Sequence, residues 1–233
     1  MTRVEPRPSP NHGERPHGAV IDLLILHYTG MRSAAAALAR LSDPAAEVSA
    51  HYVIDEDGTI YALVDETRRA WHAGVSFWAG ARDINDRSIG IELVNPGHEF
   101  GYRPFPEAQM LALEGLCRDI IARHAIPAHR VLGHSDVAPA RKLDPGELFD
   151  WARLARAGIG LWPRPAACGA APGAALSADE AAEARVLLAG LGYAMDDAAA
   201  AVAAFQRHFR PALIDGAPDR DCLMRLRDLI AQR

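Results

Sequence analysis

The segment VLGHSDVAPARKLDPG (131–146) places a histidine, a lysine and an aspartate in one loop that follows an apolar run. A second histidine, His27, stands at the end of another apolar run, LLILH. Either histidine alone would more often be a hydrogen-bonded core residue than a metal ligand. With Asp144, however, His27 and His134 make two imidazoles and one carboxylate, a common catalytic zinc set that leaves a fourth position open for water. We therefore predict that these residues bind Zn²⁺ and generate hydroxide from water near neutral pH.

Two further charged residues suit hydrolytic chemistry at such a site. Lys142 lies two residues before Asp144, so in an extended segment both side chains project from the same face. An ammonium there would stabilise the oxyanion that forms when hydroxide attacks a carbonyl. Glu92 is the only charged residue in the strand-like run SIGIELVN (88–95) and could pass a proton to a leaving amine. The alternatives are a solvated surface lysine and a glutamate that faces solvent from an edge strand.

The segment RAWHAGVSFWAG (69–80) carries two tryptophans, a histidine and glycines. Aromatic faces beside glycines suit stacking on carbohydrate or peptide, and they suit plain packing equally well. The other histidines need no chemical role. His12 and His17 are predicted to lie in the polar N-terminal arm, and His124 at a helix C-terminus. His129 and His208 are predicted to lie on the surface.

The elements that must position these residues alternate between strands and helices. Residues 18–30 read as a strand buried on both faces, followed by a short helix capped by Ser33. A hairpin turns at 56–58, and another strand covers 88–95. Residues 106–127 form a strongly amphipathic helix. This order predicts an α/β fold with a mixed central sheet flanked by helices, in which His27 and His134 both stand at strand ends.

The composition changes at WPRPAACGAAPGAAL, which indicates a linker rich in proline, alanine and glycine. Three short helical patterns follow, and Ser177 with Glu180 forms a capping box for the first. We expect three parts: a catalytic domain at 1–162, a linker at 163–175 and a small C-terminal three-helix domain at 176–233.

Composition excludes several classes of partner. The net charge of −5 comes from interspersed acids and bases, which argues against nucleic acid. No apolar run is long enough to span a bilayer, so no membrane partner is expected. The first nineteen residues contain no signal-peptide h-region, which predicts a cytoplasmic protein. Three scattered cysteines argue against a disulfide framework.

Five motifs occur together in order: LLILHYTG, SAHYVIDEDGTIY, RAWHAGVS, NDRSIGIELVNPG and GHSDVAPARKLDPG. Over residues 8–162 the chain resembles the AmpD-like zinc amidases, N-acetylmuramoyl-L-alanine amidases that share the peptidoglycan recognition protein fold. The resemblance implies zinc ligation by His27, His134 and Asp144, with Glu92 and Lys142 as catalytic residues. Ala50 and Asp144 stand where phage and animal relatives often have tyrosine and cysteine, which favours the AmpD branch. The resemblance also suggests these substrate-binding residues: Tyr28, His51, Trp71, His72 and Asn85.

The implied activity is hydrolysis of the amide between N-acetylmuramoyl, or its anhydro form, and L-alanine in peptidoglycan or muropeptides. Peptidoglycan fragments are the expected partners, in cell-wall recycling or turnover. The alternatives are a non-catalytic peptidoglycan sensor and a zinc peptidase on the same scaffold. Residues 176–232 resemble a peptidoglycan-binding module that would add affinity for longer glycan fragments, and such a module would suit a periplasmic or envelope location instead.

Overall fold

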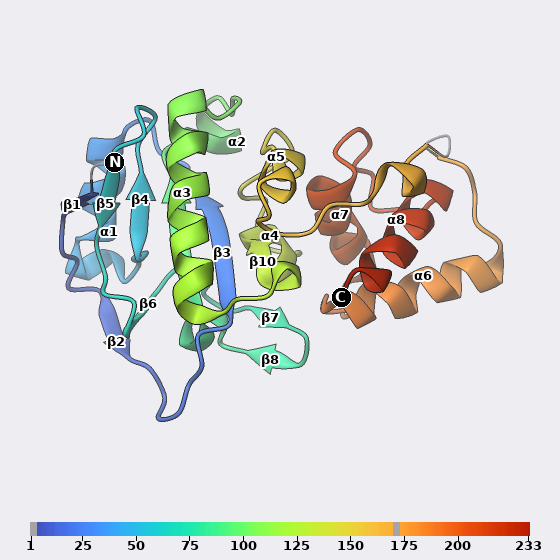
Figure 1. Ribbon diagram of the computed structural model, residues 1–233, viewed down its shortest axis with the longest axis horizontal. Coiled ribbons are helices and arrows are strands. Elements are labelled where there is room, and N and C mark those ends of the chain that lie inside the picture. Colours follow the sequence, from blue (N-terminus) through green and yellow to red (C-terminus); the bar gives the residue numbers. More distant parts are fainter. Residues whose placement is uncertain (1–3, 170–172) are drawn as a thin grey trace.

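A six-stranded mixed sheet forms the centre of the molecule in this computed structural model, which describes residues 4–169 and 173–233 (Figure 1). β4 and β5 pair antiparallel, and the other neighbours in this sheet pair parallel. The strands in spatial order are β1 (Val4–Pro6), β5 (Ile60–Ala62), β4 (Tyr52–Ile54), β9 (Ser88–Leu93), β3 (Leu23–Tyr28) and β10 (Val131–Gly133). The predicted mixed sheet is therefore confirmed.

Helices and two small strand pairs surround this sheet. The antiparallel pairs are β2 (His12–Glu14) with β6 (Arg68–Ala70), and β7 (Phe77–Trp78) with β8 (Ala81–Arg82). The helices before the linker are α1 (Ala34–Leu41), α2 (Gly97–Phe100), α3 (Glu107–His124), α4 (His134–Val137) and α5 (Trp151–Arg156). The 3₁₀ turns are η1 (Pro44–Ala46), η2 (Ile84–Arg87), η3 (Ala128–Arg130) and η4 (Pro165–Ala167).

Local sequence signals explain where these elements begin and turn. The Ser33 hydroxyl accepts a hydrogen bond from the Ala36 amide and caps α1, as predicted. The β4–β5 hairpin turns at Gly58, whose φ of 87° favours glycine. α3 spans most of the predicted amphipathic helix and buries its apolar face against the sheet.

The alternation of side chains along β3 directs its residues to two cores. Leu24 and Leu26 pack in the cluster that contains the apolar face of α3. Leu23 and Ile25 pack in a second cluster, and His27 continues their side of the strand. Because β3 lies inside the sheet, between β9 and β10, its carboxyl end is enclosed by neighbouring strand ends.

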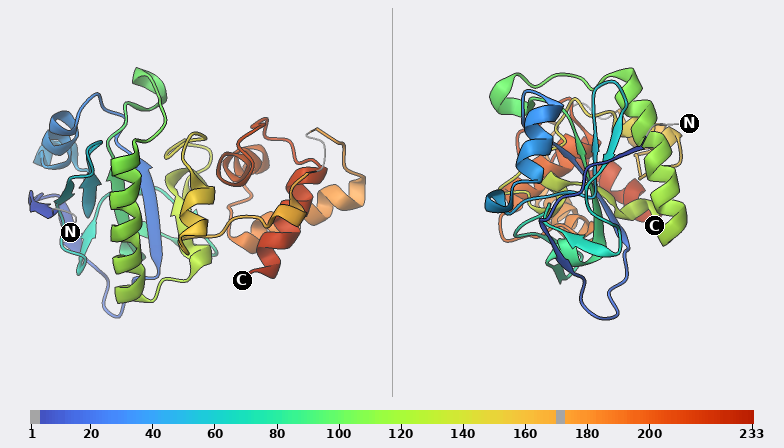
Figure 2. Two further views of the ribbon diagram at one scale, coloured as in Figure 1. Left: turned by 45° about the horizontal axis from the view of Figure 1, so that its top comes forward. Right: turned by 90° about the vertical axis from the view of Figure 1, so that its left-hand side faces the viewer.

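The three predicted C-terminal helices are present as α6 (Ala178–Leu191), α7 (Ala198–Phe209) and α8 (Arg220–Ala231). The capping box of Ser177 and Glu180 starts α6 as expected. In Figure 1 and the left view of Figure 2 the helices lie beyond the β10 edge of the sheet. Part of the expected linker, residues 170–172, lies outside the described residues.

The C-terminal helices share an apolar core with the sheet domain. One cluster of buried residues joins Leu23, Trp78 and Val137 to Leu188 and Phe205. The contact is also hydrogen bonded, because the Ala79 amide donates to the Gly192 carbonyl over 2.9 Å. Burial of this kind excludes apolar side chains of both parts from water, so α6–α8 are docked on the sheet domain rather than tethered beside it.

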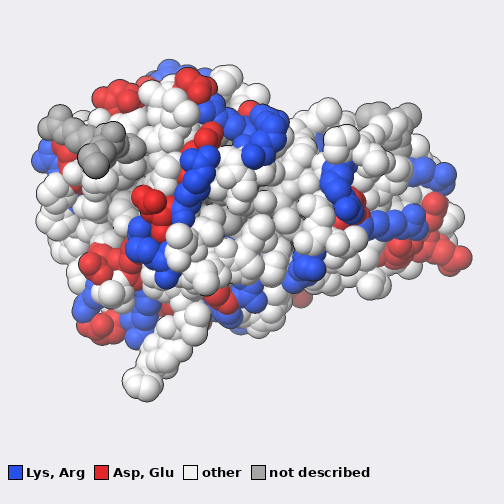
Figure 3. Space-filling view, in the orientation of Figure 1, with Lys and Arg blue, Asp and Glu red and all other residues white. Residues whose placement is uncertain are grey.

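Charge and hydropathy of the described chain are unremarkable. Basic and acidic side chains are intermixed on the face drawn in Figure 3. Within the described ranges, no helix combines the length and apolar character needed to cross a bilayer. Cys117, Cys168 and Cys222 are all free thiols, in agreement with the expected absence of a disulfide framework.

Candidate active site

Three neighbouring strand ends bring the candidate residues together. In the parallel pair β3–β9, His27 lies opposite Glu92. In the pair β10–β3, Gly133 lies opposite Leu26, so His134 follows at the level of His27. The loop after α4 returns to this edge, and the Ser135 amide donates to the Asp144 carbonyl over 2.9 Å. The carboxyl ends of β3, β9 and β10 therefore lie next to one another, as the sequence predicted for His27 and His134.

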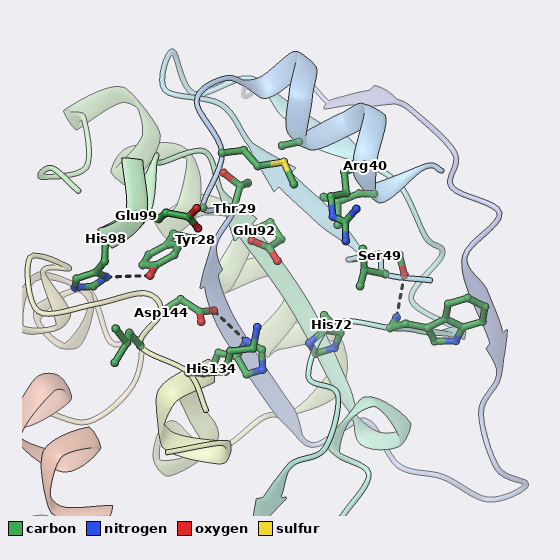
Figure 4. Close-up of a pocket in the computed structure, with 18 of the residues that line it drawn as sticks. Tyr28, Thr29, Arg40, Ser49, His72, Glu92, His98, Glu99, His134 and Asp144 are labelled. Atoms are coloured by element: carbon green, nitrogen blue, oxygen red, sulfur yellow. Dashed lines mark hydrogen bonds and ion pairs between the residues drawn. The ribbon is translucent and has the colours of Figure 1, made fainter. Parts of the chain in front are cut away.

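The three predicted ligands form one buried cluster. His27 Nδ1 lies 2.9 Å from His134 Nδ1, and each of these nitrogens lies 3.0 Å from Asp144 Oδ2. All three side chains are buried. Figure 4 shows Asp144 and His134 next to each other among the residues that line a pocket. The three atoms form a compact triangle that could cap one face of a tetrahedral ion.

The tautomer of His134 follows from its second ring nitrogen. His134 Nε2 lies 3.0 Å from the carbonyl oxygen of Ala73, which can only accept a hydrogen bond. The proton of the neutral ring therefore sits on Nε2. His134 Nδ1 is left with a lone pair that faces His27 and Asp144.

The tautomer of His27 follows from a longer chain of hydrogen bonds. The Ser88 hydroxyl donates to the Ile84 carbonyl, so its oxygen accepts from His72 Nε2 at 3.1 Å. His72 Nδ1 is then an acceptor, and His27 Nε2 donates to it over 3.0 Å. His27 Nδ1 thus also faces the cluster with a lone pair. Orienting bonds of this kind on the second ring nitrogen are usual for metal-bound histidines.

Electrostatics agree with this assignment. Burial, and then the nearby His134, lower the pKa of His27 to about 4, so the ring is neutral at pH 7. For Asp144 burial alone would raise the pKa, but the charge and hydrogen bonds of the two histidines outweigh it and the pKa is lowered. The hydrogen bonds of the outer ring nitrogens place the ring protons away from the cluster, so the facing atoms of His27 and His134 present lone pairs beside the Asp144 carboxylate. A cation is the natural partner for three such lone pairs, and the donor set suits zinc.

Glu92 lies inside the sheet and not on an edge strand, since β9 is flanked by β4 and β3. Its Oε2 atom is buried and has no hydrogen-bond partner among the described residues. Burial, and then the Asp144 carboxylate, raise the pKa of Glu92 well above its usual value. A neighbouring dication would lower that pKa again. A carboxyl group balanced in this way can take up and release a proton, as general acid–base catalysis requires.

A cavity of about 520 Å³ opens over the cluster. Glu92 points into it, between Tyr28 and Arg40 (Figure 4). Of the predicted substrate-binding residues, Tyr28, Trp71 and His72 line this cavity. The two tryptophans of segment 69–80 differ in their surroundings. Trp71 lines the cavity, where it could stack on a substrate, whereas Trp78 is buried and packs in the core.

Lys142 also lines the cavity and is partly buried there. Its positive charge acts to lower the pKa of Glu92. Lys142 is the only lysine in the chain, and every other residue of the Lys and Arg count is an arginine. That exclusive use of arginine elsewhere is a sequence signal that singles out position 142.

Two of the predicted substrate contacts, His51 and Asn85, are buried and are not among the residues that line the cavity. His51 is fully buried and does not line the cavity; its Nδ1 accepts from the Gly90 amide and its Nε2 faces the Arg68 carbonyl. Asn85 is also buried, and its Oδ1 accepts from the amides of His72 and Ala73. Both side chains hydrogen bond to backbone amides behind the cavity.

The sequence reasoning also misplaced His208 and missed several lining residues. His208 is buried between the rings of Trp151 and Phe209, at centroid distances of 3.7 and 3.8 Å. Arg40 and Arg141 line the cavity, and the sequence reasoning assigned a role to neither, although Arg141 lies in the motif GHSDVAPARKLDPG. The Ala73 carbonyl orients His134 through its backbone alone, so its residue type carries no signal.

The fold places a cluster of two histidines and an aspartate, compatible with a metal site, at the carboxyl edge of a mixed sheet and beside a cavity. The chain belongs to the N-acetylmuramoyl-L-alanine amidase family, whose model matches residues 17–147. It is an N-acetylmuramoyl-L-alanine amidase, which hydrolyses the amide between N-acetylmuramoyl and L-alanine. The family expected from the five motifs is therefore confirmed.

Named relatives resemble the chain over most of its length. It is 39% identical to the N-acetylmuramoyl-L-alanine amidase AmiD of Escherichia coli, over 86% of this chain and 79% of AmiD. It is 34% identical to the 1,6-anhydro-N-acetylmuramyl-L-alanine amidase AmpD of Haemophilus influenzae, over 62% of this chain and 86% of that protein.

Two solved structures also match the complete fold. The E. coli AmiD complex with anhydro-N-acetylmuramic acid-L-Ala-D-γ-Glu-L-Lys has a TM-score of 0.83 and 37% identity, covering 94% of this chain and 93% of AmiD. AmpDh3 from Pseudomonas aeruginosa has a TM-score of 0.79 and 36% identity, covering 93% of this chain and 94% of that one.

Proposed function

We propose that the protein is a zinc-dependent amidase in which His27, His134 and Asp144 hold the metal. The observation that carries this proposal is the meeting of three buried donor atoms within 3.0 Å of one another. A zinc ion bound there would supply a Lewis acid and make a coordinated water acidic enough to ionise near neutral pH.

Glu92 and Lys142 carry the remaining chemistry in this proposal. Glu92 accepts the proton of the attacking water and delivers it to the amide nitrogen, which leaves as the amine of L-alanine. Lys142 stabilises the negative charge that develops on the carbonyl oxygen. Their place on the wall of one cavity supports these roles, because both groups must reach the same scissile bond.

The proposed substrate is a soluble muropeptide with an anhydro-N-acetylmuramoyl group. Support comes from the AmiD complex, whose ligand is such a molecule. Tyr28 and Trp71, which line the cavity, are the proposed contacts to the sugar and the first stem residues.

The proposed division of the chain is a catalytic part at 1–162, a connecting segment at 163–175 and a helical part at 176–233. The cytoplasmic location stays a prediction, and cell fractionation tests it.

Product masses test the proposal. The purified protein, loaded with one equivalent of Zn²⁺, is incubated with anhydro-N-acetylmuramoyl-L-Ala-D-γ-Glu-L-Lys, and the products are weighed. We expect anhydro-N-acetylmuramic acid and the free tripeptide, with no product when a chelator has removed the metal. Cleavage between stem residues would show a zinc peptidase instead. Binding without any cleavage would show a peptidoglycan sensor.

A further inference from the structure

Asp136 is a fully buried carboxylate two residues after His134, and its hydrogen-bond donors come from both parts of the molecule. From the catalytic part, the Gly133 amide donates to Oδ2 over 2.7 Å. From the C-terminal helices, the Tyr193 hydroxyl donates to Oδ1 over 2.6 Å and His208 Nδ1 donates to Oδ2 over 2.7 Å. A buried carboxylate is costly unless such donors surround it.

The turn that Asp136 closes is the turn that presents the metal ligand. α4 is a single turn that begins at His134, and the bond from the Gly133 amide to Asp136 fixes its first residue. The same turn holds the Asp144 backbone through the Ser135 amide. A Cβ atom at Gly133 would lie 2.8 Å from Pro145, so the turn packs tightly against the segment that carries Asp144. A shift of α4 would therefore displace two of the three proposed ligands.

The donors on the C-terminal side are themselves held rigidly. Trp78 packs edge-on against the ring of Tyr193, with centroids 4.9 Å apart. Burial, and then the Asp136 charge, raise the pKa of Tyr193 well above its usual value, so the hydroxyl stays protonated. Trp151 and Phe209 hold the His208 ring between them. A rigid donor restrains its acceptor, whereas a mobile surface contact would not.

We propose that Tyr193 and His208 are positioning residues for the metal centre, because they fix Asp136 and thereby the turn that carries His134. The C-terminal helices are on this view a structural support of the catalytic site. This inference rests on the proposed function, since it assumes that His134 is a metal ligand.

The strongest test separates metal affinity from fold stability. In His208→Phe the aromatic stacking with Trp151 and Phe209 is kept and the donor to Asp136 is lost. His208 Nε2 is buried without a partner among the described residues, so this exchange also removes an unsatisfied polar atom. Asp136 Oδ2 keeps the Gly133 amide but loses the His208 donor, so we expect a lower unfolding temperature. In protein that remains folded at the assay temperature we expect Zn²⁺ affinity about tenfold lower, at the weak end of the effect of outer-shell exchanges.

Tyr193→Phe provides an independent variant, since it removes one oxygen and keeps the ring. Asp228→Asn is the matched control: it breaks the ion pair between α8 and Arg164, which joins the helices to the connecting segment far from Asp136. Affinity is measured by titration of Zn²⁺ against a competing chelator, on protein whose near-UV circular dichroism shows native packing. We expect reduced affinity in Tyr193→Phe and wild-type affinity, within twofold, in the control.

The outcomes distinguish the two proposals. If the wild type binds no Zn²⁺, or if His134→Ala binds it as well as the wild type does, the proposed metal site itself is wrong. If the wild type binds Zn²⁺ at that site and folded His208→Phe and Tyr193→Phe bind it equally well, the positioning role is refuted and the two residues only anchor the helices. Equal loss of affinity in Asp228→Asn would likewise refute it, because any disturbance of the docked helices would then suffice.

Discussion

His27 and Glu92 are paired directly across the parallel strands β3 and β9, so a proposed metal ligand and a proposed proton carrier lie side by side on one sheet. Backbone hydrogen bonds of both strands fix this relationship, and no loop has to close to create it. A site on strands holds its groups more accurately than one on loops. The pairing therefore suits a reaction in which the proton acceptor must sit close to the activated water.

The first prediction concerns Glu92. Glu92→Gln keeps the size of the side chain and removes its ability to carry a proton. We expect turnover of the anhydro-muropeptide to fall by about 10²-fold or more, with bound Zn²⁺ unchanged. Glu99→Gln, an exchange of an exposed carboxylate at the cavity mouth, is the control and should change turnover by no more than a fewfold. Turnover of Glu92→Gln close to that of the wild type would remove Glu92 from the mechanism.

The second prediction uses the single lysine of the chain. Lys142→Ala should lower kcat by about 10²–10³-fold, the usual effect of removing an oxyanion-stabilising donor. Lys142→Arg keeps the charge but replaces a compact ammonium by a planar fork, so we expect it to recover only part of that loss. Metal content should be normal in both variants. Full activity in Lys142→Arg would mean that position 142 needs only a positive charge.

The third prediction concerns the chain of hydrogen bonds behind His27. Ser88→Ala removes the acceptor for His72 Nε2, so the proton of His72 is no longer fixed on that nitrogen. His72 Nδ1 is then no longer held as the acceptor that orients His27. We expect Zn²⁺ affinity to fall by roughly 10–100-fold, as for other partners of metal-bound histidines. Ser76→Ala is the control, because Ser76 is also a buried serine and its hydroxyl hydrogen bonds to the backbone of Gly74 and Ile84. The same affinity in both variants would contradict the assigned tautomers.

The fourth prediction concerns stability and pH. Burial, and then the Arg15 charge, lower the pKa of His51 to about 3 in the folded protein, from about 6.5 in an unfolded chain. Below pH 6.5 the unfolded chain binds the extra proton. His51 therefore stabilises the fold fully above that pH, and this contribution is lost as the pH falls through 3. The slope that His51 alone contributes should be at most about 1.4 kcal/mol per pH unit, and His27 and His72, whose pKa values are also lowered, add to the total.

Urea unfolding of the chelator-treated protein between pH 7 and pH 4 measures this effect. His51→Asn removes the titrating group and retains an oxygen that can accept from the Gly90 amide, so its slope should be smaller than that of the wild type. His17→Asn makes the same exchange at an exposed histidine and serves as the control. An unchanged slope in His51→Asn would show that His51 does not carry the pH dependence.

Short-range signals were enough to predict the strand ends and the cluster. His27 and His134 each follow an apolar run, and parallel pairing brings such ends together wherever the strands are neighbours. Glu92 was recognisable as the lone charge in its strand. His208 was not predictable, because its burial depends on Asp136, which lies 72 residues away in sequence. A polar residue near a helix end looks exposed until the partner surface is known. The burial of His51 and Asn85 could not be predicted for the same reason.

The apolar core shared by the sheet and the C-terminal helices has an evolutionary consequence. Trp78 and Val137 can remain apolar only while α6–α8 cover them, and Asp136 can remain buried only while Tyr193 and His208 supply its donors. Deletion of the helices in a single step would expose all three at once. Family members without these helices should therefore carry correlated substitutions at positions 78, 136 and 137. An alignment of long and short members would record the order in which the two parts came to depend on each other.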